Sequence, residues 1–561
     1  MTDLPRAAGS YDYVIVGAGT AGCVLANRLS EDGRYTVCLL EAGPVDSHPF
    51  LHIPGGFIKV VSNPKFTWPL KTQAGPGTAG RPISIPQGRT LGGSSSINGF
   101  VYNRGRAHDF DHWAALGNPG WSYGQLLPYF KRSERRIGAH DPLYRGEQGA
   151  LPVTDCNWPI PLCEAFLQAA GSLGIPRNPD YNGAAQAGAG YFQRTILGRW
   201  RVSAATAFLR PARGRRNLDI RTNVQVTRLE FENQRAVGVL FNRGPGQPMH
   251  SVRATREVVL CAGAANSPKL LQISGIGSAG HLASLGVRTV IDVPGVGENL
   301  RDHYVVRSVA RVTGATTIND NARGLRLLGQ VARWAVGRPS ILTLSPSVAY
   351  AYWQSSLQIA SPDIMLVFTP GSYVASVSGL LDRFPGLTLG FGQMRPRSVG
   401  YVRAITADPY ADPQIQPNYL SDQIDQSVVV NALRLTRQLL QTPALARYVQ
   451  SQTSPPPECV KDDELLDFAR RSGNTSYHLM GTCRMGPEDD RLAVVDAQLR
   501  VRGIEGLRIV DASIMPDITS ANTMACVLAI AEKGADMILG KPALPEQDLS
   551  SRSGTEPERS P

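Results

Sequence analysis

The sequence predicts an α/β fold organised in two lobes, and three observations support this prediction. The chain has 561 residues, of which 42% are hydrophobic and 18% charged, so it can bury a large core and is too apolar to be disordered. Residues 11–44 show an apolar strand, a glycine turn, a helical pattern and a second strand, which together make one βαβ unit. A later apolar run, EVVLCAG at 257–263, is typical of another buried strand.

The glycine turn of the βαβ unit has the spacing of a dinucleotide site. Gly17, Gly19 and Gly22 fit G-x-G-x-x-G, and Glu41 ends the second strand nineteen residues after Gly22. Such glycines let the backbone close on a pyrophosphate, the helix N-terminus supplies amide donors, and the acid accepts from a ribose hydroxyl. The unit therefore predicts a Rossmann-like domain that binds NAD or FAD. Its acid disfavours NADP and does not choose between the other two.

Further segments are rich in glycine and small residues. GRTLGGSSSINGFVYNRG at 88–105 cannot sustain a stable helix or strand, and its interspersed apolar residues distinguish it from an ordinary surface loop. We expect its backbone to approach a large flat ligand. CAGAANSPKLLQISGIG at 261–277 contains a helix that we expect to start at Ser267-Pro268 and to end at Gly275, and PGVGENLRDH at 294–303 is another glycine turn.

Charge and cysteine content exclude some classes of protein. The formal net charge of +11 is spread over arginines along the chain, without a lysine-rich tail or aromatic interleaving. This pattern is typical of a solvated surface, so we expect no nucleic-acid partner. The eight cysteines have no metal-ligand spacing and several lie in apolar runs, so we expect no metal, and buried free thiols in a reducing compartment.

The sequence shows no feature of secretion or membrane insertion. MTDLPRAAGS has no apolar region typical of a signal peptide, and no stretch of about 18 uncharged apolar residues occurs. We expect a cytoplasmic protein that is at most peripheral to a membrane. The oligomeric state stays open, a homo-oligomer included. Residues 546–561 are polar and proline-containing, and we expect them to form a disordered tail.

Six segments resemble, in the same order, motifs of the glucose-methanol-choline (GMC) oxidoreductases, a family of FAD enzymes. They extend from Tyr11 to about Leu539 and are the dinucleotide unit, GRTLGGSSSIN, GAANSPKLLQISGIG, PGVGENLRDH, TSYHLMGTCRMG (475–486) and VDASIMPDITSANTMACVLAIAEKGADMI (510–538). Three further stretches are HPFLHIPGGF (48–57), RNPDYNGAAQAGAGYFQ (177–193) and NTSYH (474–478). In these the chain looks closest to a bacterial branch of the family that contains L-sorbose, choline and aliphatic alcohol dehydrogenases.

The resemblance implies a Rossmann-like FAD-binding domain interleaved with a substrate-binding domain built on an antiparallel sheet. In this chain the FAD domain would comprise residues 1–160, 215–305 and 475–545. The substrate domain would comprise residues 161–214 and 306–474. The carboxyl-terminal motifs are then distant in sequence from the glycine turn because the chain leaves the FAD domain and returns to it.

By resemblance, His478 is the catalytic base and Asn522, in SANTMA, is its partner in the substrate pocket. An imidazole has an ordinary pKa of about 6.5, so it stays neutral at working pH and takes the hydroxyl proton of an alcohol while flavin N5 accepts the hydride. The amide of Asn522 would donate to the substrate oxygen. Without the family, a lone histidine beside Tyr477 would also be read as structural, and His303 is read as part of a family turn.

The resemblance also implies contacts with FAD. Asp511 would meet the phosphate–ribitol region and Thr523 would direct its backbone N–H at the isoalloxazine. Val226 would meet adenine through its main chain, beside Trp68. A helix-capping role for Asp511 and plain core positions for Val226 and Trp68 stay open. The expected cofactor-binding set is Gly17, Gly19, Thr20, Ala21, Gly22, Glu41, Ala42, Trp68, Arg89, Leu91, Gly93, Asn98, Gly99, Val101, Val226, Ala262, Asp511, Ala512 and Thr523.

Two departures from the family pattern bear on function. Some members attach FAD covalently to a histidine just before the asparagine that here is Asn98; Ile97 occupies that position, so we expect non-covalent FAD. Choline-oxidising relatives carry a glutamate in a stretch that here reads SPSVAYAYW, with Ala349 or its neighbours in place of the acid. A neutral alcohol is therefore favoured. The aromatic residues left for a cation–π cage without an acid are Tyr350, Tyr352 and Trp353.

The expected activity is FAD-dependent oxidation of a neutral primary alcohol or polyol to the aldehyde or ketone, with electrons passed to a quinone-type acceptor. Alternatives on the same fold are an O₂-using oxidase of aryl or furanic alcohols, a choline dehydrogenase, and a hydroxynitrile lyase. An NAD-dependent dehydrogenase would rest on the N-terminal unit alone. A non-enzymatic flavoprotein would keep His478 and Asn522 without using them.

Overall fold

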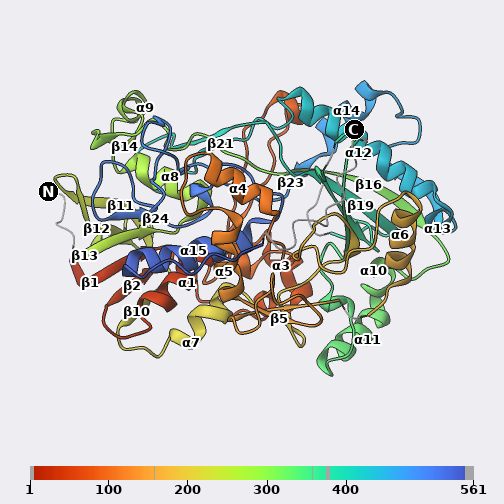
Figure 1. Ribbon diagram of the computed structural model, residues 1–561, viewed down its shortest axis with the longest axis horizontal. Helices are drawn as coiled ribbons and strands as arrows, with labels where there is room; N and C mark the ends of the chain where they lie inside the picture. The colour runs from red at the N-terminus through yellow and green to blue at the C-terminus, as the bar shows by residue number, and fades with distance from the viewer. Residues whose placement is uncertain (1–5, 157, 357, 360, 375–379, 550–561) are drawn as a thin grey trace.

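Two seven-stranded sheets lie at opposite ends of the molecule, as the computed structural model shows for residues 6–156, 158–356, 358–359, 361–374 and 380–549 (Figure 1). The first sheet has the order β10-β2-β1-β13-β12-β11, with β24 paired to β13. The strands from β10 to β13, and β24, are parallel, whereas β13, β12 and β11 are antiparallel. Their bounds are β1 Arg6–Val16, β2 Val37–Leu40, β10 Leu218–Arg221, β11 Gln225–Glu232, β12 Arg235–Asn242, β13 His250–Leu260 and β24 Leu507–Ile509.

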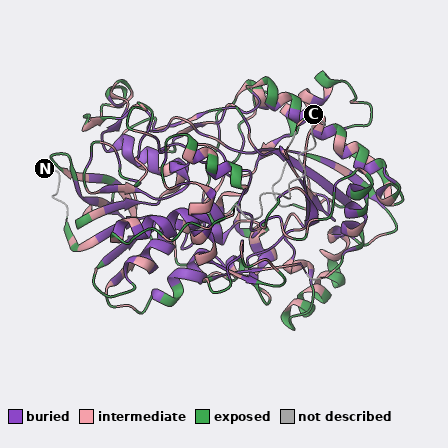
Figure 2. Ribbon diagram, viewed as in Figure 1, coloured by how far each residue is buried: buried purple, intermediate pink, exposed green. Residues whose placement is uncertain are grey.

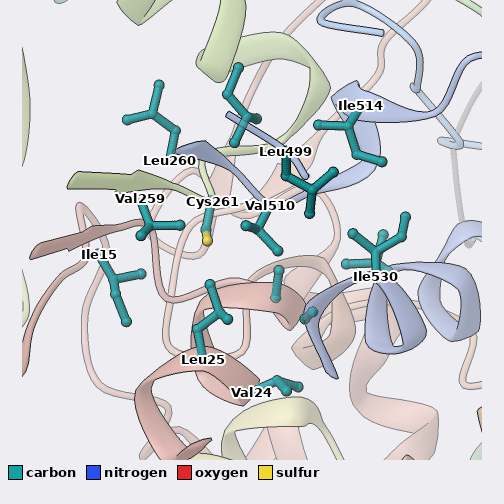
Figure 3. Close-up of a cluster of buried hydrophobic side chains, with 14 of the residues drawn as sticks. Ile15, Val24, Leu25, Val259, Leu260, Cys261, Leu499, Val510, Ile514 and Ile530 are labelled. Atoms are coloured by element: carbon teal, nitrogen blue, oxygen red, sulfur yellow. The ribbon is translucent and has the colours of Figure 1, made fainter. Parts of the chain in front are cut away.

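The expected βαβ unit is confirmed as β1, α1 (Thr20–Leu29) and β2, with the two strands parallel and adjacent. All four residues of β2 are buried because the sheet is covered on both sides, which is why its sequence is a continuous apolar run. Helix α15 (Thr523–Leu539) packs against α1. Figure 3 shows how side chains of β1, α1 and α15 meet those of β13 and of later segments in the core; the labelled ones are Ile15, Val24, Leu25, Val259, Leu260, Cys261, Leu499, Val510, Ile514 and Ile530.

Helix α8 (Gly263–Ile273) begins earlier than the sequence indicated. The expected start was Ser267-Pro268, but Pro268 lies inside the helix and the Ser267 hydroxyl is bonded to Asp511 instead of capping the helix. The first helical residue is Gly263, and the same carboxylate accepts its backbone N–H at 2.8 Å. The expected end is confirmed, since Gly275, with φ of +95°, follows the last turn.

The second sheet is antiparallel, with the order β22-β16-β19-β18-β17-β7, and β23 pairs with β16. Helices α6 (Pro161–Ser172) and α12 (Gln423–Gln441) contact this sheet and cover one of its faces. The strand bounds are β7 Gly188–Tyr191, β16 Tyr304–Val312, β17 Ala349–Trp353, β18 Ile364–Thr369, β19 Gly386–Gln393, β22 Val449–Ser454 and β23 Asn474–Thr475.

The strands of the first sheet come from the beginning, middle and end of the chain, and those of the second sheet come from the intervening stretches. The predicted architecture, a dinucleotide-binding fold interleaved with an antiparallel sheet, is therefore confirmed. Figure 2 shows that α15 is mostly buried and that the first sheet is buried only in part, whereas α11 (Gly324–Ala335) is exposed at the edge of the molecule.

The remaining elements are short. The other helices are α2 Pro49–His52, α3 Phe57–Val60, α4 Ala107–Ala115, α5 Tyr123–Ser133, α7 Arg210–Ala212, α9 Ala279–Ser284, α10 Ile318–Asn321, α13 Pro443–Ala446 and α14 Asp462–Ser472. The single turns are η1 Pro54–Gly56, η2 Pro76–Thr78, η3 Gly93–Ser96, η4 Ala205–Leu209, η5 Ile341–Thr343 and η6 Ala512–Ile514. The other strands are β3 Thr67–Trp68, β4 Gln87–Gly88, β5 Glu134–Ile137, β6 Leu151–Thr154, β8 Ile196–Leu197, β9 Trp200–Arg201, β14 Ile276–Gly277, β15 Ile291–Asp292, β20 Tyr401–Arg403 and β21 Gln414–Gln416.

The carboxyl-terminal segment makes contacts beyond α15. The backbone N–H of Gln547 donates to the carbonyl of Gly124 at 3.0 Å, and Leu549 packs against the core of the first lobe. Of the segment expected as a disordered tail, residues 546–549 are described and include these contacts, and 550–561 lie outside the described residues. Of the helices that the structure describes, none is both long and apolar enough to cross a bilayer.

Candidate active site

A cavity of about 470 Å³ lies between the two sheets and is lined by residues of both. The first lobe contributes the ends of its parallel strands and the loops that follow them. The second lobe contributes alternate residues: Met365, Val367 and Thr369 of β18 line the cavity, whereas their neighbours on the other face enter the core under α6 and α12. The loops of the first lobe thus form one side of the cavity wall, and the second sheet forms the other side.

Most of the residues predicted from the sequence lie on this wall. Of the predicted set, those that line the cavity are Gly17, Gly19, Thr20, Ala21, Glu41, Ala42, Trp68, Gly93, Asn98, Gly99, Val101, Val226, Ala262, Asp511, Ala512, Thr523, His478 and Asn522. The structure therefore brings the predicted base and the predicted nucleotide turn to one cavity, although 461 residues separate His478 from Gly17.

Three members of the predicted cofactor set do not line the cavity. Gly22 faces the turn from inside α1, where an added Cβ would lie 1.9 Å from the carbonyl oxygen of Gly17. Leu91 is buried in the core, and the guanidinium of Arg89 stacks over the ring of Trp68 at 4.9 Å. These residues support the cavity wall without lining it. A sequence motif does not distinguish such supporting residues from those that line the cavity.

The nucleotide turn is built by close backbone approach. Gly17 has φ of +100°, and a Cβ at this position would come within 2.6 Å of the carbonyl oxygen of Cys261. Gly93, from the second glycine segment, would place a Cβ 2.7 Å from the Cα of Gly19. At Gly19 itself the nearest atom to an added Cβ would be 3.7 Å away, so this turn leaves open space on its cavity side. The concave backbone surface suits a pyrophosphate group.

The carboxylate of Glu41 fixes the end of β2 beside this turn. Its two oxygens accept the backbone N–H groups of Ala18 and Gly43, each at 2.8 Å. Burial raises the pKa of Glu41 to about 7, and the two backbone hydrogen bonds oppose that rise. Each carboxylate oxygen keeps a second lone pair that can accept a ribose hydroxyl.

Asp511 joins three segments of the first lobe. One of its oxygens accepts the N–H of Gly263 at 2.8 Å and the hydroxyl of Ser267 at 2.6 Å. The other accepts the N–H of Ser513 at 2.8 Å and so caps the turn η6. Asp511 also lines the cavity, so the capping role is found in the structure and does not exclude the predicted contact with FAD.

A buried carboxylate holds the loop that carries His478. Asp302 accepts the backbone N–H of His478 at 2.8 Å with one oxygen and the hydroxyl of Thr475 at 2.6 Å with the other. Tyr419 donates its hydroxyl to the same carboxylate. Burial raises the pKa of Asp302 to about 6, and the hydrogen bonds it accepts lower it. Sequence analysis missed Asp302, although it lies in the PGVGENLRDH motif beside His303.

A chain of hydrogen bonds fixes the tautomer of His478. Nε2 of His303 lies 3.0 Å from the carbonyl oxygen of Met394, and because a carbonyl only accepts, this nitrogen carries the proton. Burial lowers the pKa of His303 to about 4, so the ring is neutral and its Nδ1 has a free lone pair. Nδ1 of His478 lies 3.0 Å from that Nδ1 and must donate to it. The lone pair of neutral His478 is therefore on Nε2.

His478 is set up as a neutral base. Burial, followed by the neighbouring His303 ring, holds the pKa of His478 well below its ordinary value. No hydrogen bond joins Nε2 of His478 to any part of the chain that the structure describes, while the residue lines the cavity. The imidazole can therefore accept a proton from a group bound there.

Asn522 presents an unused amide to the same cavity. It is the N-cap residue of α15, its backbone N–H donates to Asn103 at 2.9 Å, and its side chain makes no capping bond. Among the described residues, its buried Oδ1 has no hydrogen-bond partner. A buried polar atom left without a partner is costly, which indicates that a ligand completes its hydrogen bonding.

A buried arginine behind the second glycine segment was also missed. Arg201 donates to Oδ1 of Asn98 at 2.8 Å, and its guanidinium lies over the ring of Phe100 at 4.9 Å. Burial lowers the pKa of Arg201 to about 9. The amide of Asn98 is thereby oriented so that Nδ2 points to the sulfur of Met524, 3.3 Å away. In the sequence, Arg201 lies in GRWRVS, and nothing there distinguishes it from an arginine on the surface.

The aromatic residues considered for a cation–π cage do not line the cavity. Tyr350 and Tyr352 are fully buried and pack with Tyr181, whose ring centroid lies 4.5 Å from that of Tyr350. The hydroxyl of Tyr352 accepts from Asn103 at 2.8 Å. The cage interpretation was wrong: Tyr350 and Tyr352 are covered by the aromatic cluster that they form with Tyr181 and Phe192, and Trp353 packs against the core of the second lobe.

The charges on the wall are unevenly distributed. Glu41 and Asp511 are the carboxylates on the described wall, and both belong to the nucleotide half. Arg307 of β16 is the charged side chain that the second sheet contributes to the described wall. The part of the wall that the second sheet forms therefore carries positive charge.

A parallel dinucleotide-binding sheet that faces an antiparallel sheet across a cavity with a neutral imidazole defines a cofactor-dependent oxidoreductase. Residues 11–305 match the family model described as GMC oxidoreductase, and residues 396–531 match the model of its C-terminal part. The chain belongs to the GMC oxidoreductase family.

Similar proteins agree with this assignment. The chain is 39% identical to "Choline dehydrogenase, mitochondrial" of Homo sapiens over 96% of this chain and 91% of that protein. It is 37% identical to "Alcohol dehydrogenase [acceptor]" of Pseudomonas putida over 98% of this chain and 100% of that protein. The solved structure of pyridoxine 4-oxidase from Mesorbium loti has a TM-score of 0.83 at 32% identity and covers 95% of this chain and 99% of its own.

GMC oxidoreductases bind FAD, and the residues of this chain fit that cofactor. At Gly17 and Gly93 the neighbouring backbone leaves no room for a side chain. The turn is therefore made of bare backbone, as a bound pyrophosphate requires. Asn522 and Thr523, where α15 begins, line the same cavity, and the side chain of Asn522 makes no capping bond there. The expected family, fold class and flavin cofactor are thus confirmed.

Proposed function

We propose that this protein oxidises a neutral primary alcohol or polyol to the aldehyde or ketone, with non-covalently bound FAD as the cofactor. The observation that carries the proposal is the relay from Met394 through His303 to His478, which leaves a lone pair on Nε2 of His478 at the cavity wall. An alcohol dehydrogenation needs such a base at the hydroxyl group.

The chain's own residues would divide the work as follows. Nε2 of His478 takes the hydroxyl proton, and the imidazolium that forms keeps its Nδ1–H bonded to His303. The amide of Asn522 donates to the substrate oxygen and stabilises its developing negative charge. Asp302 holds the backbone of His478, so the ring keeps its position during turnover. When bound, FAD supplies the acceptor for the hydride that leaves the alcohol carbon.

Non-covalent attachment is supported by the side chains at the cofactor wall. Ile97, at the position where some family members carry the linking histidine, lines the cavity with an aliphatic side chain that cannot form such a bond. We further propose that residues 1–160, 215–305 and 475–545 form the FAD-binding domain and that 161–214 and 306–474 form the substrate-binding domain, because the first and second sheets fall almost entirely within these segments.

The substrate half of the wall favours a neutral alcohol over choline. A carboxylate stabilises a quaternary ammonium group by its charge, and the described wall of the second sheet carries Arg307 and no acid, beside the aromatic residues Tyr373 and Phe391. This charge would repel choline, although several similar proteins bear the name choline dehydrogenase. The proposed electron acceptor is a quinone-type carrier, in line with the alcohol dehydrogenase [acceptor] of Pseudomonas putida, and the proposed location is the cytoplasm.

The test is an anaerobic titration of the purified yellow protein. Primary alcohols, polyols, aromatic alcohols and choline are added separately while the visible absorbance of the flavin is recorded. Bleaching by a neutral alcohol, with choline without effect, would support the proposal, and air admitted afterwards would separate an oxidase from a dehydrogenase. Cleavage of a cyanohydrin without bleaching would assign the chain to the lyases instead.

A further inference from the structure

Helix α11 exposes large apolar side chains to solvent. Among the residues that the structure describes, Leu325 is 85% exposed, Leu328 64% and Val336 70%. Leu325, Leu328 and Val331 lie on one side of the helix because each follows the one before by three residues, and Val336 comes directly after the last helical residue. No residue of α11 is fully buried. An apolar face of this size on a well-formed helix indicates a surface that another apolar phase covers.

The opposite side of α11 is attached firmly to the protein. Trp334 donates its indole N–H to the carbonyl of Arg199 at 3.1 Å, and the backbone N–H of Ile341 donates to the side-chain oxygen of Gln330 at 3.0 Å. Leu327, Gln330 and Trp334 are half-buried on this side. The helix is therefore anchored by one face, and its outward face is free rather than displaced from the core (Figures 1 and 2).

Neighbouring segments extend the apolar surface. Trp200 of β9 is 42% exposed, and its ring meets that of Trp334 edge-on at a centroid distance of 4.9 Å. Helix α2 contacts β9, and α2 and α3 add the exposed side chains of Phe50 and Ile58. We call the set Phe50, Ile58, Trp200, Leu325, Leu328, Val331 and Val336 the apolar patch.

Basic residues surround the apolar patch. Residues 323–345 contain four arginines and no aspartate or glutamate. Of these, Arg326 and Arg333 lie on α11 beside its apolar face, and both are exposed. Exposed Lys59 follows Ile58 in α3. The combination of an apolar stripe, flanking arginines and tryptophan is the pattern of a helix that lies in the interface of a membrane with anionic lipids.

We infer that the apolar patch docks the protein on the surface of an anionic phospholipid bilayer, with α11 lying in the plane of the interface. The twelve residues of α11 are too few to cross a membrane, so the leucines would enter only the headgroup boundary while the arginines pair with lipid phosphates. Charge complementarity selects this occupant over a second copy of the chain, whose own patch would carry the same positive charge.

The patch is adjacent to the proposed active site. Turn η5 follows α11, and three residues after it Pro346 and Ser347 line the cavity. Leu342 of η5 lies against Gly55, and Phe57 and Val61 after that glycine also line the cavity. A lipid-dissolved acceptor or a long-chain alcohol would thus meet the cavity where the protein meets the bilayer. This last consequence rests on the proposed function, whereas the docking itself does not.

Vesicle flotation of the FAD-loaded protein tests the inference. The probes are vesicles of phosphatidylcholine alone and of equal parts phosphatidylcholine and phosphatidylglycerol, at low ionic strength and in about 1 M NaCl, where the Debye length is about 3 Å. We expect flotation with the anionic vesicles, a weaker effect with the neutral ones and a loss in high salt. Leu325→Ser with Leu328→Ser should lower the partition coefficient by roughly tenfold or more.

Matched controls distinguish docking through the apolar patch from nonspecific binding and from unfolding. Ile405→Ser with Val460→Ser removes two aliphatic side chains outside the patch that are 57% and 58% exposed, and flotation should be unchanged. Both double variants should bleach with alcohol and a soluble dye at the wild-type rate, so a failed proposed function would show independently. Equal flotation of the Leu325/Leu328 variant and the wild type would overturn the inference. The inference would also be overturned if the wild type did not bind vesicles and sedimented as a dimer, and if only the Leu325/Leu328 variant sedimented as a monomer.

Discussion

Nδ1 of His303 lies 3.0 Å from Nδ1 of His478, and the two rings meet edge-on at 85°. The relationship is directional because Met394 fixes the proton of His303 on its other nitrogen, 3.0 Å from the carbonyl. His303 is thus a positioning residue that acts through His478: it accepts the Nδ1 proton and leaves Nε2 as the base. The same pair lies 175 residues apart in the chain.

Replacement of His303 tests this arrangement. We expect His303→Ala to slow flavin reduction by about 10², since the tautomer and orientation of the base are lost while its imidazole remains. In His303→Gln the side-chain carbonyl can still accept from Nδ1 of His478, so part of the rate should return. Nitrogen-15 shifts of His478 should show a protonated Nδ1 in the wild type and a mixture in His303→Ala. Identical shifts in both would contradict the relay.

Replacement of the base itself should have a larger effect. His478→Ala should keep its flavin, because other residues form the turn, and should reduce it more slowly by roughly 10² to 10⁴. Asn522→Ala should cost about 10² through the loss of one donor to the developing alkoxide. Since the Asn522 side chain makes no capping bond to α15, this variant should unfold at nearly the wild-type temperature. A wild-type rate in either variant would remove that residue from the proposed mechanism.

The base should remain active on acidification. Because burial holds the pKa of His478 well below its ordinary value of about 6.5, the neutral form persists as the pH falls. We expect kcat/KM for a neutral alcohol to be flat from about pH 8 to about pH 6, with its acid limb below the ordinary histidine range. The pH profile of anaerobic flavin reduction measures this limb, and a limb centred at or above the ordinary value would count against a buried neutral base.

The same burial links stability to pH. His303 has a pKa of about 4 in the folded chain, so between that value and about 6.5 the unfolded chain binds more protons and the free energy of unfolding rises with pH. Asp302 acts in the opposite direction, since its raised pKa of about 6 makes the folded chain bind more protons at mildly acidic pH, and this stabilisation is lost as the pH rises.

Denaturant titrations of wild type and His303→Gln at several pH values between about 4 and 7 isolate the histidine contribution. The difference in unfolding free energy should change by at most about 1.4 kcal/mol per pH unit, with the wild type gaining relative to the variant as the pH rises. A difference that is independent of pH would mean that His303 is not buried in its neutral form.

A single methyl group should break the nucleotide turn. The Cβ of Gly22→Ala would lie 1.9 Å from the carbonyl oxygen of Gly17, so the turn must move and FAD should bind weakly or be lost on purification. Gly171→Ala is the matched control, because it is also a helical glycine and nothing lies within 4 Å of its Cβ. The control should keep its flavin and gain about 0.5 to 1 kcal/mol of stability. Flavin content of the two purified proteins decides the matter.

Local sequence was sufficient to predict the fold class and many of the residues of the cavity wall. The G-x-G-x-x-G spacing and the small-residue segments act through their own backbones, so they are visible without tertiary structure. Asp302 and His303 act on His478 from a distant segment, and only the folded chain reveals the hydrogen bonds between them. Tyr350 lies opposite Val367 and so on the cavity side of β17, but Tyr181, from a segment far away in sequence, packs on its ring, which local sequence does not reveal.

The charge of Arg307 should determine which alcohols the protein accepts. We expect Arg307→Glu to place an acid on the substrate wall, to raise kcat/KM for choline by about tenfold and to leave reduction by small neutral alcohols within a few-fold of wild type. Arg311→Glu makes the same charge change further along β16 and off the wall, so its ratio of choline to neutral alcohol should be unchanged. If both variants, or neither, gained activity with choline, the substrate preference would have to arise elsewhere than at the Arg307 side of the cavity.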